Sequence, residues 1–251
     1  MKRLEENVTI ITGGGKGIGY GLAQAFAEAG SNLVITGRTL SRLESAKERL
    51  EAEYGVKVLP IVADGADEAA IKDVVAQTIA TFGKINTLVN NAQVSKSGLP
   101  LIEHTKEDLD LSIHSGLYAA FFYMRECHPY LKESKGSVIN FASGAGLFGK
   151  LGQSSYAAAK EGIRGLSRVA AAEWGPDGIR VNVICPLAMT ESLMEWKENY
   201  PDLFAKTIQG IPLGRFADPK EDIGRVCVFL ASEDAHYVTG ETITLQGGSG
   251  L

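Results

Sequence analysis

The chain has 251 residues, a formal net charge of −5 and 45% hydrophobic residues. This length is enough for one large α/β domain, and the composition is that of a globular protein rather than a disordered one. The negative net charge, with no block of like charge, argues against nucleic acid as a partner. No apolar run approaches the roughly 20 residues that span a bilayer, and the charged N-terminus lacks the apolar core of a signal peptide. We therefore expect a cytoplasmic protein that does not bind membranes.

The cysteines and histidines give no sign of a structural metal or disulfide. The three cysteines are odd in number, widely spaced and outside any Cys-x-x-Cys pair, which fits a reducing compartment: Cys127, Cys185 and Cys227. The four histidines show no metal-binding spacing: His104, His114, His128 and His236. We expect no bound metal.

Short apolar runs alternate with helical patterns along the whole chain. The predicted strands are Val8–Ile11, Asn32–Thr36, Val56–Ala63, Ile85–Asn90, Ser137–Phe141, Ile179–Ile184 and Thr242–Leu245. The predicted helices are Gly17–Ala29, Ser41–Glu53, Glu68–Phe82, Lys106–Tyr123, Ser154–Trp174 and Pro219–Ala231. The strands are rich in Val, Ile and Leu without clean alternation, which is typical of strands buried on both faces. Repeated β-α-β units predict one α/β domain, residues 1–251, with a doubly wound parallel sheet of about seven strands flanked by helices.

Two helix starts carry capping signals, and one segment carries no regular pattern. Ser41-x-x-Glu44 resembles a capping box, and Asp218-Pro219 places a cap before a proline at the first helical position. The segment 187–211 is predicted to be an irregular insertion. Because long loops in compact domains are usually functional, we expect it to be a substrate loop that closes over bound ligands.

A glycine-rich turn, Thr12–Gly19, follows the first strand and opens the first helix. Glycines let the backbone approach a pyrophosphate closely, and the helix N-terminus supplies N–H groups and a positive dipole end. An ordinary tight turn is the alternative for a glycine cluster alone, but this position in a β-α-β unit favours a dinucleotide site. The expected cofactor contacts are Gly13, Gly15, Lys16, Gly17, Ile18 and Gly19.

The glycine turn has the spacing Gly-x-x-x-Gly-x-Gly. Together with several other segments, it resembles the short-chain dehydrogenase/reductase family, in particular its 3-oxoacyl-carrier-protein reductases and hydroxysteroid dehydrogenases. The other matching segments are Asp64, Asn90-Asn91-Ala92, Ser143, Tyr156-x-x-x-Lys160, Arg180-Val181-Asn182 and Tyr237–Gly240. The resemblance covers essentially the whole chain and implies a Rossmann-type fold. It also implies that Asp64 meets the adenine, that Asn90 packs near its ribose, and that further cofactor contacts come from Ala92, Tyr156, Lys160, Pro186 and Thr190.

The end of the second strand indicates which nicotinamide cofactor is used. An NAD site normally has an acidic residue there to hold the ribose 2′-hydroxyl, but this chain has Gly37 followed by Arg38. A guanidinium can pair with a 2′-phosphate through two hydrogen bonds, and Lys16 adds a second cation. The sequence therefore predicts that NADP(H) is preferred, with NAD(H) possible. The alternative for both cations is a solvated loop charge.

Ser143, Tyr156 and Lys160 are the predicted catalytic residues. Tyr156 and Lys160 are four residues apart on a predicted helix, so their side chains share a face. A neighbouring ammonium and an oxidised nicotinamide both favour phenolate, which lowers the phenol pKa from its reference of about 10. Tyr-x-x-x-Lys by itself is usually a surface pair, but with Ser143 and the glycine turn it predicts interconversion of a ketone and a secondary alcohol.

Three positions depart from the family pattern. Gly116 stands where the family usually has a helical Asn that anchors a water beside the lysine. His114, Ser115 or water alone could replace that relay. Gln93 stands where Asn-Asn-Ala-Gly normally ends, and Leu187 replaces the usual glycine after Pro186. A non-catalytic NADP-binding sensor or scaffold of the same fold is the alternative function, and Gly116 and Leu187 favour it.

The expected substrate is a mainly apolar small molecule. Apolar residues in two segments that the family uses around the substrate are the candidates for its pocket, with core packing as the alternative for each. They are Phe148, Leu151, Met189, Leu193 and Trp196, and His114 is added as a polar candidate. The resemblance further implies a homotetramer.

Overall fold

The computed structural model describes residues 2–250, without the side chain of Ser192. Seven strands form one parallel sheet in the order β3-β2-β1-β4-β5-β6-β7. Their bounds are β1 Val8–Thr12, β2 Asn32–Gly37, β3 Val58–Val62, β4 Thr87–Asn90, β5 Ser137–Phe141, β6 Arg180–Pro186 and β7 Thr242–Leu245. The prediction of a doubly wound parallel sheet is confirmed.

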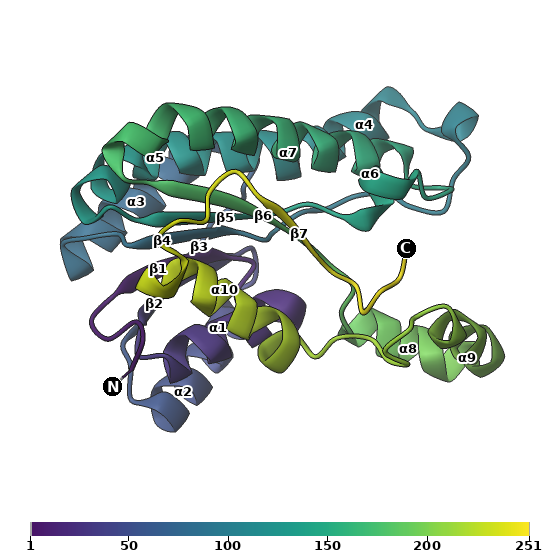
Figure 1. Cartoon of the computed structure of the whole chain (residues 1–251), viewed down its shortest axis with the longest axis horizontal. Helices are drawn as coiled ribbons and strands as arrows, with labels where there is room; N and C mark the ends of the chain where they lie inside the picture. Colours follow the sequence, from purple (N-terminus) through teal and green to yellow (C-terminus); the bar gives the residue numbers. More distant parts are fainter. Residues whose placement is uncertain (1, 251) are drawn as a thin grey trace.

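Helices cover both faces of the sheet (Figure 1). Helices α1, α2 and α10 lie on one face, and α3, α4, α5 and α7 lie on the other. The helix bounds are α1 Gly17–Glu28, α2 Leu40–Tyr54, α3 Glu68–Phe82, α4 Lys106–Ser112, α5 Ala119–Ser134, α6 Gly144–Phe148, α7 Ser154–Trp174, α8 Glu191–Asn199, α9 Pro201–Gln209 and α10 Arg225–Ala231. Two π-helical stretches, Ile113–Tyr118 and Pro219–Gly224, precede α5 and α10. Within residues 2–250 there are also three single 3-10 turns: Leu101–Glu103, Gly175–Asp177 and Glu233–Ala235.

The apolar side chains of the strands pack into two separate hydrophobic cores, one on each face of the sheet. Ile11 and Ile35 pack on the face of α1, whereas the neighbouring Ile10 and Val34 pack on the opposite face with Tyr123 of α5. Successive strand residues point to opposite faces, so a strand covered on both sides favours apolar residues at successive positions. This explains why the strands show no alternation in the sequence.

Three local predictions are corrected by the structure, and one helix is added. The helix expected over Lys106–Tyr123 is α4, a π-helical stretch and then α5, which continues through Pro129 to Ser134. The segment 187–211 is not irregular, because it contains α8 and α9. Helix α6 was not predicted. The capping box at Ser41 is also wrong, since α2 begins at Leu40 with Thr39 as its cap residue. The cap at Asp218 is confirmed: its carboxylate accepts from two backbone N–H groups at 2.8 Å.

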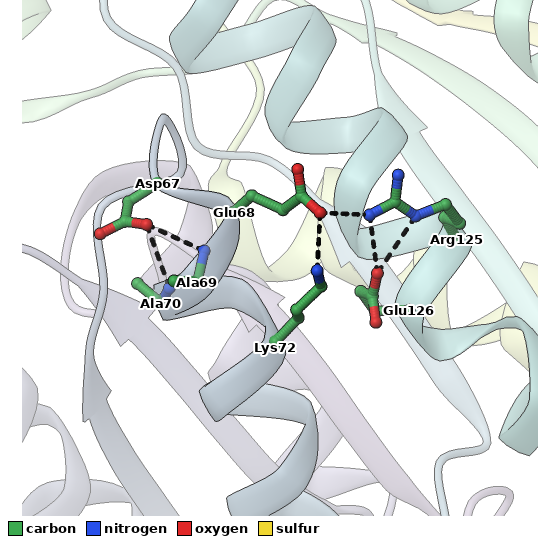
Figure 2. Close-up of polar contacts among 7 residues, drawn as sticks. All are labelled: Asp67, Glu68, Ala69, Ala70, Lys72, Arg125 and Glu126. Atoms are coloured by element: carbon green, nitrogen blue, oxygen red, sulfur yellow. Dashed lines mark hydrogen bonds and ion pairs between the residues drawn. The ribbon is translucent and has the colours of Figure 1, made fainter.

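An ion-pair network fastens the start of α3 to α5 (Figure 2). Asp67 caps α3 by accepting from Ala69 and Ala70, and Glu68 meets Lys72 at 2.8 Å and Arg125 of α5 at 2.6 Å. Hydrogen bonds from Lys72 and Arg125 lower the pKa of the Glu68 carboxyl. Exposed pairs of this kind stabilise little one at a time. They join α5 to the first residue of α3, which follows the loop that carries Asp64.

Within residues 2–250, no helix is long and apolar enough to cross a membrane. The same residues contain no cluster of three or more His, Cys, Asp or Glu side chains that could hold a metal ion. All three cysteines are buried and unpaired.

Candidate active site

A cavity of about 420 Å³ lies at the carboxyl ends of β1, β2, β3 and β4. It opens where the strand order reverses, between β1 and β4, which is the position that ligands occupy in open α/β sheets. Thr12 ties the two loops there, because its hydroxyl oxygen accepts from the backbone N–H groups of Asn91 at 2.9 Å and Ala92 at 3.0 Å. The crevice is therefore formed by the backbone on both sides.

The glycine turn forms one wall of the cavity and fits a pyrophosphate. Gly13 and Gly17 have φ values of +72° and +55°, which side chains disfavour, and a Cβ on Gly19 would lie 2.1 Å from the Gly13 carbonyl oxygen. The turn leads into the N-terminus of α1, whose N–H groups and dipole attract anions. All six residues predicted from the turn line the cavity: Gly13, Gly15, Lys16, Gly17, Ile18 and Gly19.

Two arginines border the opposite end of the cavity. Arg38 follows β2 as predicted, and Arg42 of α2 joins it although the sequence reading did not include it. Within residues 2–250, neither guanidinium forms an ion pair. Asp64 also lines this end, and its carboxylate accepts from the backbone of Ala66 at 3.0 Å. Two cations and one carboxylate therefore face this end of the cavity. The spacing Arg-x-x-x-Arg across a helix start was the available signal for Arg42.

The remaining predicted cofactor residues divide into two groups. Ala92 and Thr190 line the cavity. Asn90 does not line it, because its buried amide donates to Asn140 Oδ1 at 2.8 Å, inside the sheet. Its neighbour Asn91 lines the cavity instead and donates to the Thr12 carbonyl at 2.9 Å. Pro186 ends β6 and is not a lining residue of this cavity.

Ser143, Tyr156 and Lys160 lie together beyond this cavity. Ser143 follows β5 and caps α6, accepting from Ala145 N at 3.1 Å, and its hydroxyl hydrogen-bonds to the Tyr156 phenol. Lys160, one turn further along α7, donates to the Phe141 carbonyl oxygen at 2.6 Å. Its Nζ atom is 5.5 Å from the centre of the Tyr156 ring. The residues that the sequence spacing relates are therefore adjacent in space.

Burial controls the protonation of this group. It raises the pKa of the Tyr156 phenol, and the Ser143 hydrogen bond lowers that pKa by less. Burial also lowers the pKa of Lys160 to about 7, since the ammonium is removed from water. The pKa of the phenol is therefore raised, whereas the sequence analysis expected it to be lowered. That expectation assumed a charged lysine and an oxidised nicotinamide beside the phenol. The buried phenol and the buried ammonium are thus both shifted toward their neutral forms.

The expected substrate residues lie in three places. Phe148 of α6 and Leu151 are 56% and 94% exposed, on the segment that leads from Ser143 to α7. Met189, Leu193 and Trp196 are partly buried against a small core under α8 and α9: Phe204, Ile211 and Phe216. His114 lines a second hollow of about 280 Å³ together with Arg38 and Asp64, at the adenosine end of the site. The structure therefore does not place His114 beside Tyr156.

Glu191, the first residue of α8, contacts the glycine turn. Its carboxylate accepts from the backbone N–H of Gly17 at 3.3 Å, and Glu191 lines the cavity. This N–H belongs to the helix terminus that a pyrophosphate would use, so a bound dinucleotide and the Glu191 carboxylate compete for the same donor. The sequence reading did not identify Glu191.

We expect Glu191→Gln to raise the affinity for NADPH by about two- to fivefold, because an exposed charge contact of this kind is weak but repels phosphate. Fluorescence titration with NADPH measures the affinity. Glu195→Gln, on the same exposed helix, is the matched control and should bind like the unmutated protein. Weaker binding by Glu191→Gln would show that the carboxylate supports the bound state instead.

Comparison with known proteins agrees with the class that this fold and site define. Residues 13–249 match the family model described as enoyl-(acyl carrier protein) reductase. The chain belongs to the short-chain dehydrogenase/reductase family, and it is an oxidoreductase that uses a nicotinamide cofactor.

Individual relatives span essentially the whole chain. It is 61% identical to the 12alpha-hydroxysteroid dehydrogenase of a Clostridium species, over 100% of this chain and 99% of that protein. It is 36% identical to the 3-oxoacyl-[acyl-carrier-protein] reductase of Thermotoga maritima, over 98% of both chains. Among solved structures, levodione reductase superposes with a TM-score of 0.92 at 33% identity, over 98% of both chains.

Proposed function

We propose that the protein is an NADP(H)-dependent hydroxysteroid dehydrogenase that interconverts a ketone and a secondary alcohol. The whole chain serves as one dinucleotide-binding domain. The observation that carries the proposal is the placement of Ser143, Tyr156 and Lys160 at the carboxyl edge of the sheet that also holds the dinucleotide cavity. The 61% identity to a 12alpha-hydroxysteroid dehydrogenase supports the choice of substrate class.

The chain's own residues supply binding, orientation and the proton. Bound NADPH supplies a hydride to the substrate carbonyl carbon. The Ser143 hydroxyl hydrogen-bonds to the substrate oxygen and holds it beside Tyr156, whose phenol gives that oxygen its proton. Lys160 then returns a proton to the phenolate and recovers one from solvent. The sum is one hydride and one proton added to the ketone, and oxidation of the alcohol runs the same steps backwards.

A flat polycyclic substrate fits the apolar groups around this centre. Phe148 and Leu151 expose apolar surface on one side of the Ser143 segment, and the small core under α8 supports the other segment of the proposed pocket. Apolar pockets with few polar groups are typical of such ligands. An acyl thioester is the second candidate substrate, favoured by the 36% identity to a 3-oxoacyl reductase.

The test is a substrate comparison in both directions with both cofactors. A steroid carrying a 12α-hydroxyl group and its 12-ketone are compared with a 3-oxoacyl thioester, and NADPH or NADH absorbance gives the rate. Turnover of the steroid pair with NADP(H) supports the proposal. Preference for the thioester would replace the substrate class, and cofactor binding without turnover of any alcohol or ketone would favour a sensor or scaffold.

Assembly belongs to the same proposal. Helices α5 and α7 expose apolar side chains on their outer faces, among them Phe121, at 40% exposure, and Val169, at 54%. Exposed apolar groups on neighbouring elements are typical of interaction surfaces. We propose that α5, α7 and β7 pack between copies in a cytoplasmic homotetramer.

A further inference from the structure

The side chain of Gln93 lies against Gly116. Gln93 follows β4, and Gly116 is a buried residue of the π-helical stretch before α5. A Cβ built on Gly116 would lie 2.6 Å from Gln93 Cδ and 2.7 Å from its Oε1 atom. The carboxamide therefore occupies the volume that any other residue at position 116 would need. The two departures found separately in the sequence are one arrangement in space.

The Gln93 carboxamide has a free acceptor in a buried place. Its Nε2 donates to the Ser112 carbonyl oxygen at 3.4 Å, whereas its Oε1 atom is buried and accepts no hydrogen bond from residues 2–250. Buried acceptors without a partner are uncommon and indicate a donor that the polypeptide does not supply. The π-helical stretch is itself unusual, and such bulges occur frequently at functional sites.

Contacts between helices place Gly116, against which the Gln93 carboxamide lies, near the level of Lys160 on α7. Ser112 hydrogen-bonds to Ser155 of α7 at 3.2 Å, and Leu117 contacts Gly162, where a Cβ would lie 2.8 Å from Leu117 Cδ2. The segment 112–117 and α7 therefore run parallel. The sequence numbers of the contacting residues differ by 43 for Ser112 with Ser155 and by 45 for Leu117 with Gly162. Adding this offset to 116 places Gly116 level with residues 159–161 of α7, which include Lys160.

We propose that Gln93 is a positioning residue for proton transfer, with its carboxamide oxygen linked to the Lys160 ammonium through one bridging donor such as a water molecule. This proposal rests on the proposed function of Tyr156 and Lys160. The link favours the charged lysine, and the charged lysine favours the Tyr156 phenolate. Lys160 is 3% exposed, so a polar connection is also the route by which it recovers a proton from the cavity, which Gln93 lines.

The other charged and titratable groups around the pair do not provide this function. Cys185 of β6 faces both Tyr156 and Lys160, and burial raises its pKa to about 11. Glu161 and Arg164 of α7 act on Cys185. Asp108 of α4 pairs with Lys96 at 3.4 Å, and a backbone hydrogen bond lowers its pKa. His114 contacts the Asp110 carbonyl oxygen at the adenosine end.

Two single variants remove the carboxamide from Gly116 in different ways. Gln93→Met keeps the length of the side chain without its amide, and Gly116→Ala displaces the flexible end of Gln93 while leaving that residue intact. In both, the Tyr156 phenol should titrate about 0.5 to 1 pH unit higher, the size expected for one hydrogen bond. The rate of alcohol oxidation should reach its plateau at correspondingly higher pH, because the neutral lysine no longer stabilises the phenolate.

The phenol is titrated by its ultraviolet difference spectrum in the absence of cofactor, with Tyr156→Phe as the subtraction that isolates it. Gly165→Ala on α7 is the matched control, since its Cβ meets nothing within 4 Å and the change adds only helix propensity. The double variant Gln93→Ala with Gly116→Ala should shift the titration no further than Gln93→Ala alone. Moving the carboxamide, by Gln93→Gly with Gly116→Asn, should return the titration toward that of the unmutated protein.

An unshifted phenol titration in both Gln93→Met and Gly116→Ala would overturn the proposal and leave Gln93 as packing. Failure of the proposed function gives a different result. In that case Tyr156→Phe retains turnover, whatever the phenol titration shows. A variant that loses thermal stability without a titration shift counts against the proposal, because a merely structural role predicts that outcome.

Discussion

Replacement of Tyr156 by phenylalanine is expected to lower turnover by about 10²- to 10⁴-fold, the usual contribution of a positioned proton donor. Affinity for NADPH should change little, because the phosphate turn and the two arginines line the cavity and the phenol hydroxyl does not. Initial rates with the ketone and fluorescence titration with NADPH separate the two effects. Tyr237→Phe is the matched control, since Tyr237 is 96% exposed and should behave like the unmutated protein. Robust ketone reduction by Tyr156→Phe would exclude Tyr156 as the acid.

The neighbouring residues should rank below Tyr156 in a definite order. Ser143→Ala should lower turnover less, because the hydroxyl orients the substrate oxygen and does not transfer the proton. Its thermal stability must be measured alongside, since Ser143 also caps α6. Lys160→Met should lower turnover strongly and raise the phenol pKa, because a positive charge favours phenolate.

The sign of the pH dependence follows from the same groups. In the proposed mechanism oxidation needs the phenolate, so its rate is expected to rise with pH until the phenol is deprotonated. Reduction needs the protonated phenol and falls over the same range. Because burial raises the pKa of Tyr156 and lowers that of Lys160 to about 7, a protein in which Lys160 has lost its charge reaches the oxidation plateau only at high pH.

Exchange of the residues after β2 is expected to reverse the cofactor preference. Loss of a hydrogen-bonded charged contact costs about 1.5–3 kcal/mol, so Arg38→Leu should weaken NADPH binding about 10- to 100-fold. Gly37→Asp adds the carboxylate that favours a free 2′-hydroxyl. The structure has room for it, since the atom nearest to a Cβ at Gly37 is Leu43 Cδ2 at 3.5 Å. The double variant should bind NADH at least as well as NADPH by fluorescence titration.

Two further variants sharpen this measurement. Arg42→Leu should weaken NADPH binding but leave NADH binding unchanged, if Arg42 also meets the 2′-phosphate. Arg49→Leu is the control on the same helix, because Arg49 stacks over Tyr20 and does not line the cavity. Equal affinities of the unmutated protein for the two cofactors would contradict the assignment of Arg38.

The predicted positions of helices and strands agree with the structure wherever a single local sequence pattern determines the element. The glycine turn, the buried strands and the long helix with Tyr156 and Lys160 follow from backbone conformation and hydrophobic pattern, which neighbouring residues decide. The prediction of one continuous helix over Lys106–Tyr123 was wrong because the sequence there has helical periodicity throughout. A π-bulge adds a residue to one turn without changing composition, so the hydrophobic pattern does not reveal the stretch Ile113–Tyr118. Helices α8 and α9 were missed because their apolar residues pack on a small separate core rather than on the sheet.

The sequence by itself determined the fold class, the dinucleotide turn, the cation after β2 and the identity of the serine, tyrosine and lysine. These depend on residue type at fixed short spacing, which the chain carries directly. Tertiary structure decided what depends on distance between remote segments: Arg42 beside Arg38, Asn91 rather than Asn90 at the cavity, and Glu191 on the glycine turn. It also decided that Gln93 fills the space left by Gly116. That pairing joins the end of β4 to a helix more than twenty residues later, and volume exclusion between them acts only once both elements pack on the same sheet.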